Sequence, residues 1–206
     1  DDLKDFRQWG SATPGHPEVG HTAGVEVTTG PLGLGVANAV GMAIAESQLR
    51  TRYGAGLFDH HVFAIAGDGC LSEGISHEAA SLAGHLGLGK LVMIYDDNNI
   101  TIDGETDLAL SDDAAARFRS YGWHVLELGE VGDDLDALEA GLNEAKAVTD
   151  APSLVIVRTI IGTPATESAD THEAHGYAFL DEDIASTTGA MCMPVDETFH
   201  VPSDVL

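Results

Sequence analysis

The sequence predicts an α/β fold in which a parallel sheet carries helices on both faces. Four short apolar runs alternate with helical patterns along the 206-residue chain. Apolar strands separated by helices are typical of βαβ units, whose parallel strands are covered on both sides. Hydrophobic residues make up 44% of the chain, which is enough for the buried core that such a sheet requires.

The expected elements follow one another in the order of a wound sheet. Residues 1–30 are rich in Gly, Thr and Pro and predict irregular backbone. A helical pattern of small and apolar residues then runs from Gly33 to Arg50. The elements expected after it are strand 61–65, helix 74–86, strand 91–95, a helix opened by Ser111-Asp112-Asp113, strand 123–129, helix 133–148 and strand 153–161. We expect residues 1–180 to form one binding domain and residues 181–206 a tail or linker.

Composition and charge narrow the function classes. No apolar run approaches the roughly 20 residues of a membrane helix, and the first residues do not resemble a signal peptide. Two cysteines give no disulfide framework, which favours a reducing cytoplasm. The formal net charge of −25 argues against nucleic acid and anionic membranes as partners. This charge indicates either adaptation to a salty cytoplasm or an ordinary acidic protein.

The stretch AGDGCLSEG (66–74) directly follows an apolar strand and places two glycines around one aspartate. In open α/β sheets, ligands bind at the carboxyl ends of the strands. Gly67 and Gly69 allow a close approach of the backbone, and a helix start favours an anion such as a phosphate. Asp68 would repel a phosphate, so the combination predicts a divalent cation that bridges the two.

The next strand supplies the missing ligand type. YDDNN (95–99) ends that strand, and Asn98 lies 30 positions after Asp68, about the length of one βαβ unit. The carboxyl ends of neighbouring parallel strands meet, so these side chains are expected to lie together. Gly-Asp-Gly or Asn-Asn alone is a common turn or loop, but their joint spacing favours a metal–diphosphate site.

These residues carry a family resemblance. GDGCLSEGISHEAASLAGHLGLGKLVMIYDDNNITIDGET (67–106) resembles the thiamine diphosphate motif of transketolases. TPGHPEVGHTAGVEVTTGPLGLGVANAVGMAIAE (13–46) resembles the cofactor loop and following helix of the same family. The similarity extends from about Phe6 to Gly176, and it implies the thiamine-diphosphate-binding fold.

The resemblance implies a role for each site residue. Asp68, Asn98 and the carbonyl of Ile100 correspond to the ligands of Mg²⁺ or Ca²⁺, and Gly69 to the glycine whose N–H approaches the diphosphate. Gly30 and Leu32 correspond to backbone contacts of the aminopyrimidine ring.

Three further positions are implied to take part in catalysis. His16 corresponds to a substrate-binding histidine, and His175 to one that contacts both diphosphate and substrate. Glu73 corresponds to a carboxylate that links two cofactor sites across a dimer interface. Without the resemblance, His16 would be read as a surface-loop residue and Glu73 as a carboxylate at a helix start.

The resemblance also implies a partner. The pyrimidine-binding half of the family, which carries the acid that activates the cofactor, is not among these 206 residues. We therefore expect a fragment or a split subunit, inactive alone, that works in a homodimer or heterotetramer with a pyrimidine-binding domain or subunit. The implied activity is transfer of a two-carbon ketol unit between sugar phosphates in the pentose phosphate pathway. The alternatives are a dihydroxyacetone synthase-like enzyme and a non-catalytic cofactor-binding subunit.

Overall fold

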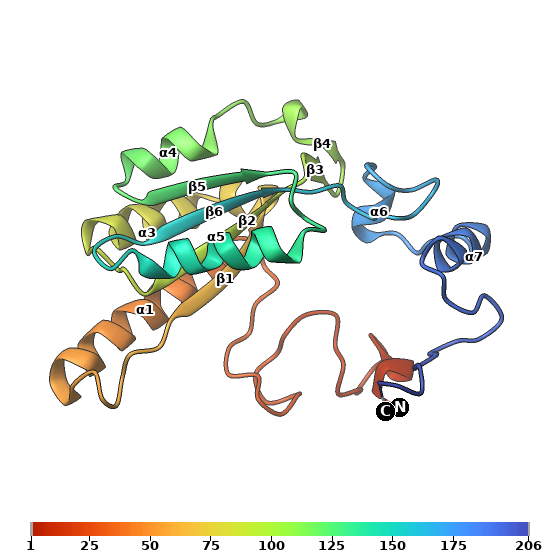
Figure 1. The fold of residues 1–206 in the computed structure, drawn as a ribbon, viewed down its shortest axis with the longest axis horizontal. Coiled ribbons are helices and arrows are strands. Elements are labelled where there is room, and N and C mark those ends of the chain that lie inside the picture. Colours follow the sequence, from red (N-terminus) through yellow and green to blue (C-terminus); the bar gives the residue numbers. More distant parts are fainter. Residues whose placement is uncertain (1, 206) are drawn as a thin grey trace. The chain divides into compact units, whose positions relative to one another are not determined.

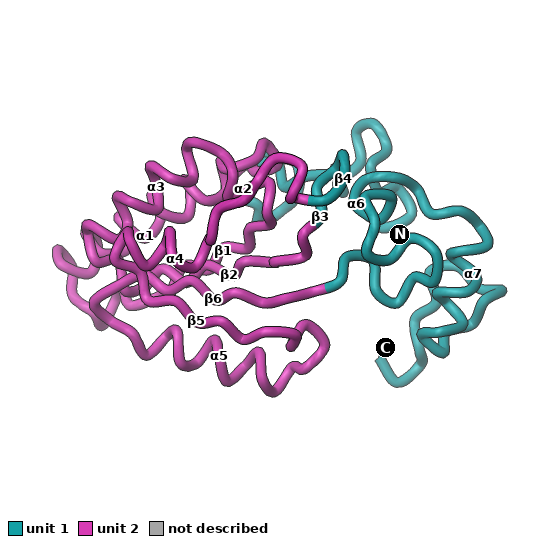
Figure 2. The backbone as a smooth tube through the Cα atoms, turned by 90° about the horizontal axis from the view of Figure 1, so that it is seen from above, with its two compact units in different colours: residues 1–26, 100–105, 160–206 teal, residues 27–99, 106–159 magenta. Residues whose placement is uncertain are grey.

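The computed structural model of the protein describes residues 2–205, which fall into two compact units. Unit 1 is drawn from the segments 1–26, 100–105 and 160–206 (Figure 2). Unit 2 comprises residues 27–99 and 106–159 and contains the main sheet.

Unit 2 contains a four-stranded, entirely parallel sheet (Figure 1). The strand order is β1-β2-β6-β5. The strands are β1 (Val62–Gly67), β2 (Leu91–Asp97), β5 (His124–Gly129) and β6 (Ser153–Arg158). This arrangement confirms the predicted parallel sheet, and it makes the first two strands direct neighbours. The last strand is shorter than expected, because it ends at Arg158.

Helices cover both faces of this sheet, as predicted. They are α1 (Leu34–Tyr53), α3 (Gly74–His85), α4 (Ala114–Ser120) and α5 (Leu135–Ala147). One core cluster joins residues of α1, α3 and α4 to one face of the sheet, whereas the other joins α5 to the opposite face. Successive residues of β2 divide between the two cores: Leu91, Met93 and Tyr95 belong to the first, and Val92 belongs to the second. This alternation follows from the two-residue period of a strand.

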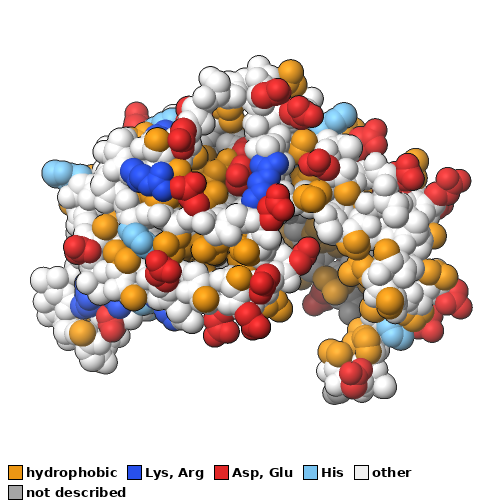
Figure 3. Space-filling view, turned by 45° about the horizontal axis from the view of Figure 1, so that its top comes forward, with side chains coloured by type: hydrophobic (Ala, Val, Ile, Leu, Met, Phe, Trp, Pro, Cys, Tyr) orange, Lys and Arg blue, Asp and Glu red, His pale blue; other side chains and the backbone are white. Residues whose placement is uncertain are grey.

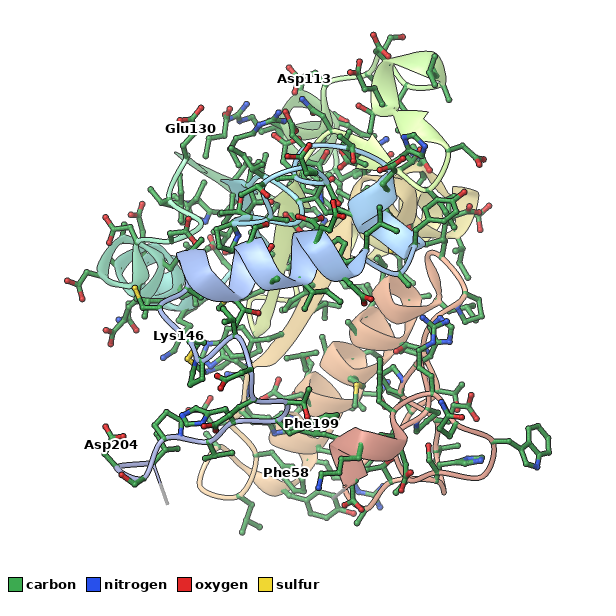
Figure 4. The ribbon with its side chains drawn as sticks, turned by 90° about the vertical axis from the view of Figure 1, so that its right-hand side faces the viewer. Phe58, Asp113, Glu130, Lys146, Phe199 and Asp204 are labelled. Atoms are coloured by element: carbon green, nitrogen blue, oxygen red, sulfur yellow. The ribbon has the colours of Figure 1, made fainter. Side chains whose placement is uncertain are left out.

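Local sequence signals explain where two of the helices begin. The carboxylate of Asp113 accepts a hydrogen bond of 2.9 Å from the Ala116 amide and caps α4. Asp134 caps α5 in the same way, through a 3.0 Å bond from the Ala137 amide. Each cap satisfies a backbone donor that the helix itself leaves unpaired. The side chain of Asp113 is exposed at the surface (Figure 4).

The sequence predicts a turn at Gly67-Asp68-Gly69, but in the structure a helix already begins at Asp68. Residues Asp68–Ser72 form the short helix α2, which ends where Glu73 adopts an extended conformation. The Ser76 hydroxyl donates to the Cys70 carbonyl at 2.5 Å and so joins the first turn of α3 to α2. The sequence interpretation missed this five-residue helix because it is too short for a periodic pattern.

Unit 1 has little regular structure. It contains the 3₁₀ turn η1 (Asp2–Asp5), the hairpin β3–β4 (Ile100–Thr101 and Gly104–Glu105), α6 (Glu173–Gly176) and α7 (Asp181–Ala190); the 3₁₀ turn η2 (Thr106–Leu108) belongs to unit 2. Residues 6–26 contain no helix or strand, which agrees with the irregular backbone predicted there. Within residues 2–205, no helix is both long enough and apolar enough to cross a membrane.

Candidate functional site

The carboxyl ends of β1 and β2 bring Asp68 and Asn98 together. Asp68 directly follows β1, Asn98 directly follows β2, and the register pairs Gly67 with Asp96. Both side chains are buried, each with 6% of its surface exposed. The backbone of Asn98 lies close enough to the Asp68 carboxyl to act on its pKa, which it lowers against the larger effect of burial. The structure therefore shows the contact that their spacing predicts, while their role as metal ligands stays a prediction.

One oxygen of the Asp68 carboxylate accepts a hydrogen bond, and the other accepts none. Its Oδ1 accepts a hydrogen bond from the Tyr95 hydroxyl at 2.5 Å, whereas its buried Oδ2 has no hydrogen-bond partner. Burial raises the pKa of Asp68 above its usual value, and the negative charge of Asp97 acts in the same direction. A buried carboxylate oxygen without a partner is unfavourable unless a cation neutralises it. This oxygen therefore fits a bound divalent metal.

The amide of Asn98 is oriented by a neighbouring carboxylate. Asn98 Nδ2 donates to Asp96 Oδ2 at 3.4 Å, and the Thr159 hydroxyl donates to the other Asp96 oxygen. This contact directs the amide nitrogen to Asp96, so the amide oxygen is the atom of Asn98 that a metal could use. Among residues 2–205 no three His, Cys, Asp or Glu side chains gather into a metal site. The ion would therefore need backbone and phosphate oxygens as further ligands, which Mg²⁺ accepts readily.

The predicted cofactor loop lies against the same end of unit 2. A Cβ atom placed on Gly69 would lie 3.3 Å from Cδ1 of Leu32, so a side chain at Gly69 would crowd that leucine. Gly30 (φ 134°) and Gly33 (φ 80°) adopt left-handed backbone conformations that other residues rarely take. A Cβ on Gly33 would come within 3.0 Å of Glu73, so the loop also adjoins that exposed carboxylate.

A polar cavity of about 250 Å³ opens beside Asp68. Tyr95, Asp97 and Arg117 also line it. Arg117 is ion-paired with Asp112 and donates to the Leu71 carbonyl at 3.1 Å, and it thereby ties α4 to α2. Asp68 therefore forms part of the wall of a polar cavity.

Three predicted site residues belong to unit 1. His16 is exposed and lines a cavity of about 500 Å³ together with Arg7, Trp9 and His21. His175 is exposed on the short helix α6. Ile100 is buried where the hairpin β3–β4 begins. Their assigned roles stay predictions.

Sequence reasoning did not single out Tyr95, although its hydroxyl contacts the central carboxylate. A tyrosine at the end of an apolar strand is typical of a core residue, and Tyr95 does belong to the larger core cluster. No sequence signal marks this contact, because it depends on the strand register, in which Ala66 pairs with Tyr95 and Asp68 lies two residues further along. The same side chain thus packs in the core and contacts the site.

We expect Asp68→Asn to stabilise the metal-free protein. The raised pKa of Asp68 means that folding disfavours its charged form, so the penalty is present at neutral pH and disappears as the pH falls through that pKa. Asparagine retains an acceptor for Tyr95 but carries no charge. In chelator, melting temperature should rise at pH 7, and the gain should shrink towards pH 4. A lower melting temperature at pH 7 would contradict this account.

Known proteins resemble the chain over its full length. Residues 1–206 match the family described as transketolase, thiamine diphosphate binding domain. A transketolase from Nostoc is 52% identical to this chain, and one from Escherichia coli is 50% identical. Each alignment covers the whole of this chain and 31% of the relative.

The fold agrees with solved structures. A Pichia stipitis transketolase in complex with sedoheptulose 7-phosphate gives a TM-score of 0.94 at 46% identity, with 99% of this chain and 30% of that chain covered. A transketolase from Leishmania mexicana gives the same TM-score at 45% identity. The chain spans about a third of the length of these relatives. It belongs to the transketolase family, and it corresponds there to the thiamine diphosphate binding domain.

Proposed function

We propose that this chain is the diphosphate-binding part of a transketolase. The observation that carries the proposal is the buried, unpartnered Oδ2 of Asp68 beside Asn98 at the ends of two adjacent strands. With thiamine diphosphate and the rest of the enzyme, the protein transfers a two-carbon ketol unit from a ketose phosphate to an aldose phosphate. The Pichia stipitis relative solved with sedoheptulose 7-phosphate supports this substrate class.

Each of the residues that we propose for the cofactor site has its own part in holding the cofactor. Asp68 and Asn98 bind Mg²⁺ or Ca²⁺ through side-chain oxygens, and the carbonyl of Ile100 adds a third ligand. Gly69, which lacks a Cβ, lets the diphosphate approach the backbone closely. Gly30 and Leu32 hold the aminopyrimidine ring through backbone groups.

Bound thiamine diphosphate supplies a nucleophilic carbon and a place for the electrons of the broken carbon–carbon bond. The chain orients the substrate for that chemistry. His16 and His175 hydrogen-bond substrate oxygens and move the protons that the bond cleavage requires. His175 also contacts the diphosphate.

The proposed assembly is a dimer or heterotetramer. Glu73 belongs to the carboxylate network between two cofactor sites, and a pyrimidine-binding domain or subunit completes each site. Residues 1–180 carry the binding function, and residues 181–206 serve as a tail or linker.

Calorimetry with Asp68→Ala tests the metal site. We expect the wild-type chain to bind thiamine diphosphate more tightly when Mg²⁺ is added. Asp68→Ala should lose this metal-dependent gain and keep its fold, because the residue lies at the rim of the sheet. Asp133→Ala, which removes an exposed aspartate of the same unit, is the matched control. Unchanged metal-dependent affinity in Asp68→Ala would refute the proposed site.

A further inference from the structure

We propose that Tyr95 is a positioning residue that makes Oδ2 the preferred metal-binding oxygen of Asp68 and so favours Mg²⁺ over Ca²⁺. The inference rests on the proposed function and deepens it, since it concerns the metal preference of the same site. It assigns a role to a side chain that belongs to the core and whose hydroxyl contacts Asp68.

The first step is the contact itself. The Tyr95 hydroxyl donates to Oδ1 of Asp68 at 2.5 Å, while Oδ1 of Asp97 lies further away, at 3.4 Å. A phenol has a single proton to donate, so the shorter contact with Asp68 takes it. Charge-assisted O–H···O⁻ bonds of this length are the stronger class of hydrogen bond. Oδ1 of Asp68 therefore uses one lone pair for Tyr95, which makes it a weaker metal ligand than Oδ2.

The second step is the rigidity of the donor. Tyr95 is 8% exposed and belongs to the larger core cluster. It is also fixed in the sheet, where it pairs with Ala66 of β1. Its hydroxyl cannot move away from Asp68 without repacking the core. A donor held this firmly fixes the orientation of the carboxylate, and Oδ2 remains the oxygen that is free for an ion.

The third step is that the two ions require different numbers and arrangements of oxygen ligands. Mg²⁺ requires a nearly ideal octahedron of single oxygens at 2.0–2.1 Å. Ca²⁺ accepts six to eight ligands and often takes both oxygens of a carboxylate. A carboxylate whose Oδ1 already accepts a strong hydrogen bond still gives Mg²⁺ its single oxygen, but it is a poorer bidentate ligand for Ca²⁺. Removal of the Tyr95 hydroxyl would release Oδ1 and favour the bidentate mode.

Tyr95→Phe tests this role, since it removes one oxygen and retains the ring that fills the core. Tyr121→Phe is the matched control, because the Tyr121 hydroxyl lies 3.2 Å from His77 Nδ1 and makes its bond there. Calorimetry of thiamine diphosphate binding, titrated over Mg²⁺ and Ca²⁺ concentration, gives an apparent affinity for each metal. Thermal unfolding in chelator shows whether each variant is folded.

We expect the ratio of Ca²⁺ to Mg²⁺ affinity to rise roughly tenfold in Tyr95→Phe, within the range seen when residues behind metal ligands are changed. Tyr121→Phe should keep the wild-type ratio. If Tyr95 had only a structural role, its loss would lower the affinities for both metals equally. An unchanged affinity ratio therefore overturns the inference, even if both affinities fall. If the wild-type chain showed no metal-dependent binding of thiamine diphosphate, the proposed function would be overturned, and the role of Tyr95 would be overturned with it.

Discussion

The purified 206-residue chain alone is expected to form no sedoheptulose 7-phosphate from xylulose 5-phosphate and ribose 5-phosphate. The loop proposed to hold the aminopyrimidine ring is open on one side, since Gly30 is exposed and 52% of the Leu32 surface is exposed. A half-open site cannot press that ring into place or protonate it. The chain also spans only about a third of its transketolase relatives.

Addition of a pyrimidine-binding half should restore activity. The half would come from a transketolase relative, and product would be measured by mass spectrometry. The same half mixed with the Asp68→Ala chain is the control and should give no product, because the metal site is then missing. Turnover by the purified chain alone would show that the activating acid lies within these residues.

The arrangement of the sheet could be predicted because several signals agree. Each strand has six or seven residues with an apolar stretch at its centre, and the helices α4 and α5 begin with a capping aspartate. The meeting of Asp68 with Asn98 follows from the topology alone, because consecutive parallel strands that are neighbours must end at the same edge. This part of the site therefore needed only the spacing and strand polarity.

Side-chain partners could not be predicted in the same way. The bonds from Tyr95 to Asp68 and from Thr159 to Asp96 depend on register and rotamers, which a pattern of apolar residues does not determine. They join residues 27 and 63 positions apart, so no local motif contains them.

The helix α7 was missed for a different reason. The segment from Asp181 has weak apolar periodicity, which predicted a tail rather than a helix. The helix begins with three acidic residues, which favour a helix N-terminus. Asp183 is buried there, where it accepts hydrogen bonds from the Ser168 hydroxyl and, at 3.4 Å, from the Glu167 amide. The stabilising contacts come from residues distant in the sequence.

Molar salt is expected to raise the melting temperature of the chain. The sequence contains 34 acidic and 9 basic residues. Acidic side chains are spread over the face seen in Figure 3, where Lys and Arg occupy few places. Five carboxylates fall within ten residues around the start of α5: Glu130, Asp133, Asp134, Asp136 and Glu139. Repulsion among them acts against the compact state when the salt concentration is low.

Salt screens both the repulsion among the carboxylates and the attraction within ion pairs. Screening should favour the folded state because the ion pairs at the surface contribute little. Several ion pairs, such as Arg119–Glu127, lie at the surface. Exposed pairs of this kind contribute about 0–1 kcal/mol each. The Debye length falls from about 30 Å at 0.01 M to about 3 Å at 1 M salt, so most of the repulsion disappears over that range.

The measurement is a series of thermal unfolding curves from 0.01 to 2 M KCl, in chelator and without thiamine diphosphate. A triple variant, Glu130→Gln, Asp133→Asn and Glu139→Gln, separates charge from other salt effects. These positions leave the α5 cap at Asp134 intact. The variant should melt higher than wild type at low salt and gain less from added KCl. A flat or falling wild-type curve, or an equal gain in the variant, would show that self-repulsion does not limit stability.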